Sequence, residues 1–77
     1  MNKQQRKSLD EAIELLEQAQ EIINTIKDEE QEKFDNLSEG LQATENNQKL
    51  ETNASTLENA SASVDEVLEY INEAKDN

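Results

Sequence analysis

The stretch that decides the fold is LETNASTLENASASVDEVLEYI, residues 50–71. Its apolar and small residues recur in alternating steps of four and three, at Leu50, Ala54, Leu57, Ser61, Val64, Leu68 and Ile71. This heptad spacing places one seam along a helix that packs against another helix. The seam runs through Ser63-Val64-Asp65-Glu66, which also resembles a helix-capping box. The sequence therefore predicts one helix over residues 45–75, with a break near Ala62 as the alternative.

A second helix is predicted upstream, over residues 8–35. Ser8 and Glu11 fit a capping box at its start. The apolar residues that follow are spaced by three and four and form one stripe: Leu9, Ala12, Ile13, Leu16, Ala19, Ile22, Ile23 and Ile26. The stripe fades after Ile26 and returns only at Phe34 and Leu37, so the polar stretch between them is left without an apolar contact surface.

Residues 36–44 are predicted to form the turn, because they contain the only glycine, Gly40, and the turn-forming residues Asn36 and Ser38. Two long helices joined by a short loop pack antiparallel. The predicted fold is all-α, a coiled-coil-like antiparallel two-helix hairpin forming a single domain over residues 1–77. Self-association is also expected, since dimerisation into a four-helix bundle would cover more of each stripe.

Composition excludes several classes of function. The chain of 77 residues has no cysteine and no histidine, which excludes disulfides and thiolate metal sites. A thin hairpin has no deep pocket in which a pair of carboxyl groups could be tuned for acid–base work. We therefore expect no enzyme activity and no cofactor. The longest runs of large apolar residues are pairs, so no membrane-spanning helix is predicted, and a cytoplasmic location is expected.

Charge is distributed unevenly. The chain has 7 basic and 19 acidic residues and a net charge of −12, with three of the basic residues among the first seven positions. Such a surface repels phosphate backbones and anionic lipids. Direct binding to nucleic acid or to a membrane is therefore disfavoured, and a protein partner with a basic surface is favoured.

Acidic residues recur at helical spacing on both predicted helices. On the first they are Asp10, Glu14, Glu17, Glu21 and Asp28, and on the second Glu58, Asp65, Glu69, Glu73 and Asp76. Residues four apart on a helix are separated by about 6 Å along its axis, a spacing similar to that of the charges on a DNA strand. The rows could therefore imitate a nucleic-acid backbone at a basic groove. The alternative is that they are the solvated side of an amphipathic helix.

The stretch from Asp28 to Glu39 partly matches a calcium-binding loop, with Glu30, Glu32, Asn36 and Glu39 at ligand positions. Lys33, however, occupies the position at which that loop requires glycine for a sharp turn. A solvated, acidic helix end is the favoured interpretation.

Residues 28–42, DEEQEKFDNLSEGLQ, resemble a segment of short uncharacterised proteins of phages and prophages, whose pattern is similar to E-E-Q-E-x-F/Y-D-N-L-P-E-x-L-Q. Ser38 stands where proline is usual in that pattern. The resemblance implies a mobile-element origin and brings no catalytic residues. It makes the turn a candidate binding site, with contacts at Phe34, Asp35, Asn36, Glu39 and Gln42. The alternative is that Asp35 and Asn36 cap the helices, and that Phe34 and Leu37 close the core.

Together these patterns predict a small acidic accessory protein of the phage type that binds and modulates a basic host protein. The alternative function is structural self-assembly through the seam from Leu50 to Ile71. Calcium binding is a third interpretation.

Overall fold

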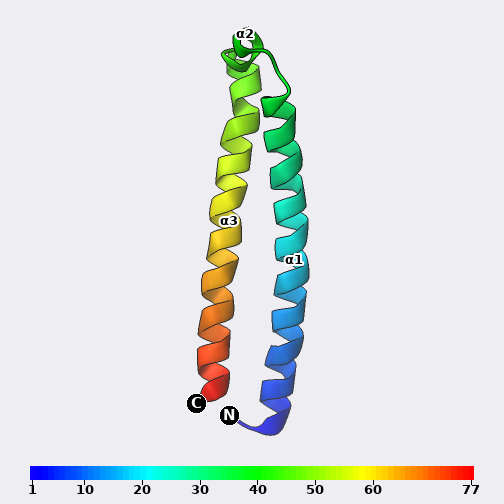
Figure 1. Ribbon diagram of the computed structural model, residues 1–77. Helices are drawn as coiled ribbons and strands as arrows, with labels where there is room; N and C mark the ends of the chain where they lie inside the picture. The colour runs from blue at the N-terminus through cyan, green and yellow to red at the C-terminus, as the bar shows by residue number, and fades with distance from the viewer.

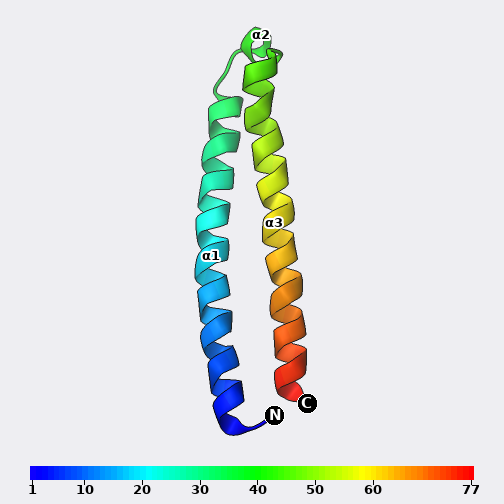
Figure 2. The same ribbon diagram turned by 180° about the vertical axis from the view of Figure 1, so that it is seen from behind.

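The protein is a hairpin of two long antiparallel helices, as a computed structural model that describes all 77 residues shows (Figure 1). Helix α1 spans Lys3–Asp35, the short helix α2 spans Glu39–Gln42, and helix α3 spans Glu45–Asp76. The molecule is a rod of 58 × 15 × 13 Å. Seen from the front and from behind, α1 and α3 lie side by side along their length (Figures 1 and 2). The predicted all-α class with a packed helix pair is confirmed.

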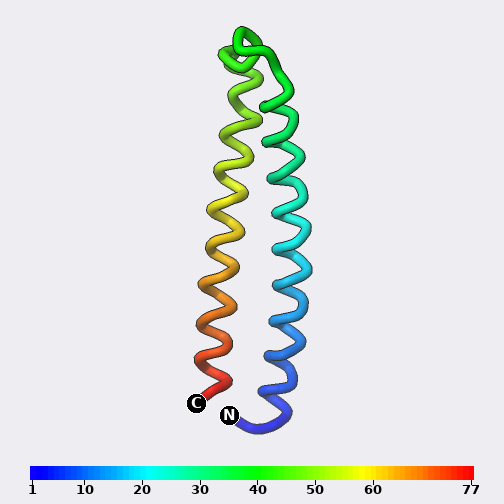
Figure 3. Tube along the Cα trace, viewed as in Figure 1, coloured from blue at the N-terminus to red at the C-terminus, as the bar shows by residue number.

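The chain reverses once, at α2, so both termini lie at the opposite end of the rod (Figure 3). Helix α3 passes through Ala62 without interruption, as the favoured interpretation of its heptad seam predicted. No helix of the hairpin combines the length and the apolar content that crossing a bilayer requires.

Helix α1 begins five residues before the predicted start at Ser8, and that prediction is wrong. Asn2 caps it instead: its Oδ1 accepts a hydrogen bond of 2.7 Å from the backbone N–H of Gln5. The Gln5 Oε1 in turn accepts one of 3.0 Å from the backbone N–H of Asn2. This reciprocal pair satisfies two backbone donors that a helix start leaves open. In the common capping box a hydroxyl and a carboxylate accept these two hydrogen bonds, whereas here two side-chain amides accept them.

The turn is more ordered than the predicted irregular loop of residues 36–44. Gly40 lies inside α2, and no residue of the chain has a positive φ. Side chains hold the reversal together: the Gln42 Nε2 donates to the Phe34 carbonyl at 3.0 Å. The Asn47 Nδ2 donates to the Leu41 carbonyl, also at 3.0 Å. These bonds satisfy carbonyl groups that a helix end leaves without partners.

Helix α3 packs through the predicted seam. Every residue of that seam is buried or half-buried, and Ala54 and Ser61 are the two buried residues of the chain, at 4% and 8% exposed. Their small side chains let the backbone of α1 approach closely. Tyr70, which its place between Leu68 and Ile71 assigned to the edge of the core, is instead 70% exposed. It lies one position before the seam residue Ile71 and so points away from α1.

Helix α1 packs through part of the predicted stripe, since its members Leu9, Ala12, Ile13, Leu16 and Ile23 are half-buried. One heptad seam of half-buried residues continues from α1 into the turn: Leu9, Ile13, Leu16, Gln20, Ile23, Lys27, Glu30, Phe34 and Leu37. Ile22 and Ile26, placed in the stripe by their spacing, are 62% and 44% exposed, and Ala19 is also exposed. The prediction failed because polar residues occupy three positions of the true seam.

These polar residues fit the seam because their long stems cover apolar surface while their ends reach partners on α3. The Gln20 Nε2 donates to the Ser61 carbonyl at 2.9 Å. The Lys27 Nζ donates to the Glu58 carboxylate at 2.8 Å. The seam therefore continues through the polar stretch after Ile26, where the sequence seemed to leave a gap.

Candidate protein-binding face

Polar contacts between the two helices line one side of the seam. The Lys75 ammonium donates to the Asp10 carboxylate. The Gln20 Nε2 donates to the Asp65 Oδ1 at 2.8 Å, and Lys27 pairs with Glu58. These contacts fix the register of the hairpin, because residues 10–27 of α1 run beside residues 58–75 of α3 in the opposite direction.

The predicted acidic rows of α1 and α3 come together on this side. Asp10 and Asp28 are the ends of the α1 row. Asp10 contacts Lys75 of α3, and Asp28 contacts Lys27, so both lie on this side. Glu14, Glu17 and Glu21 lie between them in heptad steps and are all exposed. On α3, contacts with α1 place Glu58 and Asp65 on the same side, and Glu69 and Asp76 continue that row in steps of four and seven. We call this combined surface the acidic face. Glu73, which was also predicted for the α3 row, stands one heptad after Glu66 and lies outside it on the exposed back of α3.

A shallow groove crosses the acidic face between the helices. Lys27, Asp28 and Gln31 line it from α1, and Glu51 and Glu58 line it from α3. Sequence reasoning missed Glu51, although it stands one heptad before Glu58. The seam could have identified it. Glu51 directly follows the seam residue Leu50, as Glu58 follows Leu57, and both therefore border α1 on this side.

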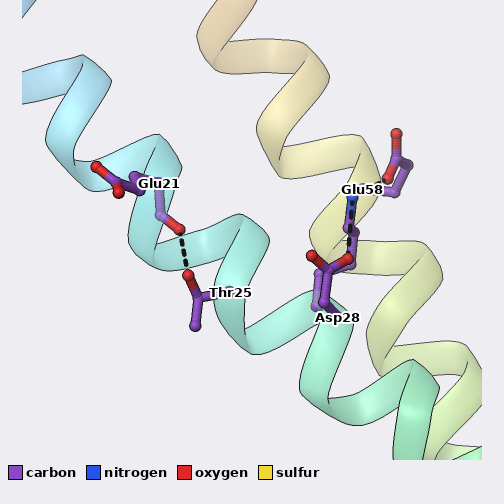
Figure 4. Close-up of polar contacts among 5 residues, drawn as sticks. Glu21, Thr25, Asp28 and Glu58 are labelled. Carbon is purple, nitrogen blue, oxygen red and sulfur yellow. Dashed lines mark hydrogen bonds and ion pairs between the residues drawn. The ribbon is translucent and has the colours of Figure 1, made fainter.

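Lys27 is the cation at the centre of this groove. Its ammonium lies 2.8 Å from the Glu58 carboxylate and 3.7 Å from that of Asp28. Figure 4 shows Asp28 of α1 and Glu58 of α3 on neighbouring turns of the two helices, with Glu21 and Thr25 earlier in α1. The hydrogen bond to Glu58 raises the pKa of Lys27 above its ordinary value; partial burial opposes this shift, and the charges of Glu58 and Asp28 support it. Lys27 therefore stays charged and holds the two acidic rows together.

Elsewhere the carboxylates do not gather into a chelating cluster. No group of three or more acidic residues is placed to hold a metal ion. Asp28 to Asp35 belong to α1, so the stretch that partly matches a calcium-binding loop is helical over its first eight residues. Its potential ligands are spread around the helix, and do not converge as they would in a loop.

The candidate contacts at the turn divide into two groups. Phe34 is half-buried and its carbonyl accepts the bond from Gln42. Asn36 forms the C-terminal cap of α1. The alternative placed Phe34 in the core and Asn36 at a cap, which agrees with this arrangement, whereas Asp35 is the last residue of α1 and not its cap. Asp35, which also accepts a bond of 2.9 Å from the Gln31 Nε2, and Glu39 are exposed, and Asp35 stands one heptad after Asp28 in the acidic row.

The acidic face offers one kind of chemistry, the binding of cationic groups. Its carboxylates accept hydrogen bonds and ion pairs, and guanidinium groups bind carboxylates through two parallel bonds. The groove is open and shallow, so it suits side chains projecting from another surface better than an enclosed small molecule. Comparison of the chain with protein-family models, with curated proteins and with solved structures finds no match.

Proposed function

We propose that this chain is a small acidic accessory protein of the phage type, which binds a host protein and modulates its activity. The partner is a protein with a basic surface. The observation that supports this proposal is the meeting of two acidic rows, from helices far apart in sequence, on one side of a rod. The resemblance of residues 28–42 to phage and prophage proteins supports the biological setting.

The dimensions of the acidic face favour a partner that handles nucleic acids. Carboxylates of the α1 row are separated by about 4.5 to 6 Å along the helix axis from Asp10 to Glu21, and the steps of seven residues in the α3 row measure about 10.5 Å. The two rows are separated by roughly the 8–10 Å distance between packed helices. That distance lies between the ~6 Å and ~12 Å widths of the DNA grooves across which phosphates face each other. The face thus presents two rows of negative charge to a partner protein's groove that binds duplex nucleic acid.

Binding through this face follows electrostatic rules. The field of a chain with net charge −12 accelerates encounter with a basic surface, and salt weakens that attraction. Cross-helix contacts hold Asp10 and Glu58 in place, which reduces the conformational entropy lost on binding. Asp35 and Glu39 extend the face toward the turn, whereas Phe34, Asn36 and Gln42 support the turn from within.

The test is capture of a host protein from lysate, using the tagged chain at low and at high salt. The binding variant replaces Glu14, Glu17 and Glu21 with glutamine. The control variant carries Glu11→Gln, Glu32→Gln and Glu66→Gln, which removes the same charge from exposed positions outside the two rows. We expect the wild type and the control to capture a partner at low salt, and the binding variant to lose it.

Two results would contradict the proposal. One is the absence of any partner whose capture decreases as salt increases. The other is equal loss of capture in both variants, since net charge alone would then account for binding. Competition by duplex DNA for the captured partner is the expected sign that the face imitates a nucleic acid. Failure of that competition would restrict the function to ordinary protein binding.

A further inference from the structure

The side of the hairpin opposite the acidic face exposes large apolar side chains. Leu15 and Ile22 are each 62% exposed, Ile26 is 44% exposed, Val67 is 43% exposed and Tyr70 is 70% exposed. We call these five residues the apolar face. Scattered apolar residues are common on protein surfaces, but a contiguous group indicates an interaction site.

Contacts around Ile26 show that the five residues share one side. Ile26 borders a shallow hollow together with Asn53 and Thr56 of α3, and the Asn53 Nδ2 donates to the Glu30 carboxylate on this side at 3.3 Å. Val67 stands two heptads after Asn53, and Tyr70 stands two heptads after Thr56. Residues a whole number of heptads apart lie on the same side of a packed helix, so Val67 and Tyr70 face the same way as Ile26.

On α1 the same reasoning applies to Ile22 and Leu15. Ile22 lies four residues before Ile26, and Leu15 lies one heptad before Ile22. Ala19 falls between them, so the line alternates large and small side chains. The 62% exposure of Ile22, two positions from the seam residue Gln20, agrees with this placement.

Both halves of the apolar face lie at the same level of the rod. The ion pairs of Asp10 with Lys75 and of Lys27 with Glu58 bracket this level. All five residues fall within the two bracketed segments, 10–27 and 58–75. The apolar face runs along α1 from Leu15 to Ile26, which is about 16 Å of the rod's length at 1.5 Å per residue, and it spans both helices.

Charge decides which partner this face suits. Within the two bracketed segments, the heptad positions that carry the five residues and the alanines between them hold no charged residue. The acidic face looks in the opposite direction. This is the side of the rod on which two chains of net charge −12 can approach without bringing carboxylate rows together.

We propose that a second copy of this chain covers the apolar face, so that two hairpins form a four-helix bundle with both acidic faces outward. An interface on a two-fold axis must be self-complementary, and alternating Leu15, Ala19 and Ile22 on α1 lets large side chains of one copy enter the gaps of the other. The apolar face occupies the middle of a side that is 58 Å long and 15 Å wide, so an interface of the roughly 800 Å² per partner that stable dimers bury also includes the polar positions on either side of it.

The hairpin also gains the core that it lacks alone. Only Ala54 and Ser61 are buried in the isolated chain. A chain of this size commonly needs association or another constraint, because a single small core contributes little stability. In the bundle, Ile22, Ile26 and Val67 would leave water together with the seam residues behind them.

Sedimentation equilibrium of the purified full chain tests the proposal. We expect the wild type to have twice the 8.8 kDa mass of the chain. Ile22→Glu should raise the Kd of the dimer more than about 100-fold, since each copy then buries a charge at a central position. Gln18→Glu adds the same charge on an exposed site outside the apolar face and should leave the dimer intact.

A second measurement needs no substitution. Tyr70 is the only tyrosine and the chain has no tryptophan, so its fluorescence reports on this face alone. Quenching of Tyr70 by acrylamide should decrease as protein concentration rises through the Kd of the dimer. Circular dichroism of each variant at the same concentrations shows whether the helices are intact.

Three results would overturn the proposal. These are a wild type that stays monomeric up to about 1 mM, quenching of Tyr70 that is independent of concentration, and equal association of the Ile22→Glu and Gln18→Glu variants. Salt separates this interface from the acidic face: screening should strengthen the dimer of like-charged chains and weaken capture of a basic partner. Either interface can therefore fail while the other stands.

Discussion

Ile22 and Ile23 are neighbours of identical chemistry that the hairpin uses for different purposes. Ile23 lies half-buried in the seam against α3, whereas Ile22 is 62% exposed on the apolar face. Replacing each in turn with alanine removes the same atoms from adjacent positions of one helix. The pair therefore separates the stability of the hairpin from the stability of its dimer.

The expected magnitudes follow from burial. Removing a core isoleucine side chain costs about 2–5 kcal/mol, and the partial burial of Ile23 places its loss near the lower limit, at about 2 kcal/mol. At low protein concentration, Ile22→Ala should change the free energy of unfolding by less than about 0.5 kcal/mol. The sign should be slightly favourable, because alanine has the higher helix propensity.

The assay is urea denaturation followed by circular dichroism, at protein concentrations below and above the Kd of the dimer. Ile23→Ala should be destabilised at both. Ile22→Ala should match the wild type when dilute and fall below it when concentrated, because it loses only the contribution of association. Equal losses for the two variants in dilute solution would refute the assignment of the seam to Ile23.

Three further predictions concern single polar residues. Asn24 has a side-chain oxygen that is shielded from solvent and has no partner, so Asn24→Ala should raise the free energy of unfolding by about 1 kcal/mol; a decrease in urea denaturation would contradict this. Asn2→Ala should lose about 1 kcal/mol with its cap, visible as reduced helix content, and Asn2→Ser should restore most of it. The pKa of Lys27 is raised in the folded protein above the unfolded value of 10.5. Its stabilising contribution is therefore complete below pH 10.5 and is lost as the pH rises through the folded pKa. The Lys27→Met variant should lose less stability than the wild type when both are titrated to alkaline pH.

The packing side of the second helix could be predicted closely because its seam consists of small and apolar residues. Between Leu50 and Ile71 no charged residue occupies a seam position, so the heptad pattern has one solution. The small residues Ala54 and Ser61 belong to the seam by spacing alone, and the structure buries them most deeply.

The first helix was harder because it carries two overlapping patterns. Adjacent Ile22 and Ile23 belong to different lines, and a hydrophobicity rule merges them into one wide stripe. Gln20 and Lys27 occupy the true seam, and their polar ends find partners only on α3. Nothing within the first helix identifies those partners, so the sequence of this helix alone could not define its packing side.

The two faces of the rod were predictable only in part. The acidic rows were visible on each helix, but their meeting on one side depends on the register of the hairpin. That register is set by contacts such as Asp10 with Lys75 and Lys27 with Glu58. The apolar face was hidden because Ile22 and Ile26 were assigned to the packing stripe of the first helix and Tyr70 to the edge of the core.

Because the chain turns back once, its first and last residues sit at one pole of the rod (Figure 3). A cysteine introduced at Asn77 would be the only thiol in the chain, so a single dye could be attached there without further substitutions. In a bundle whose hairpins point the same way, the two dyes would be close neighbours and transfer energy strongly. In a bundle whose hairpins point in opposite directions, the two dyes would be separated by nearly the 58 Å length of the molecule, and the energy transfer would be weak.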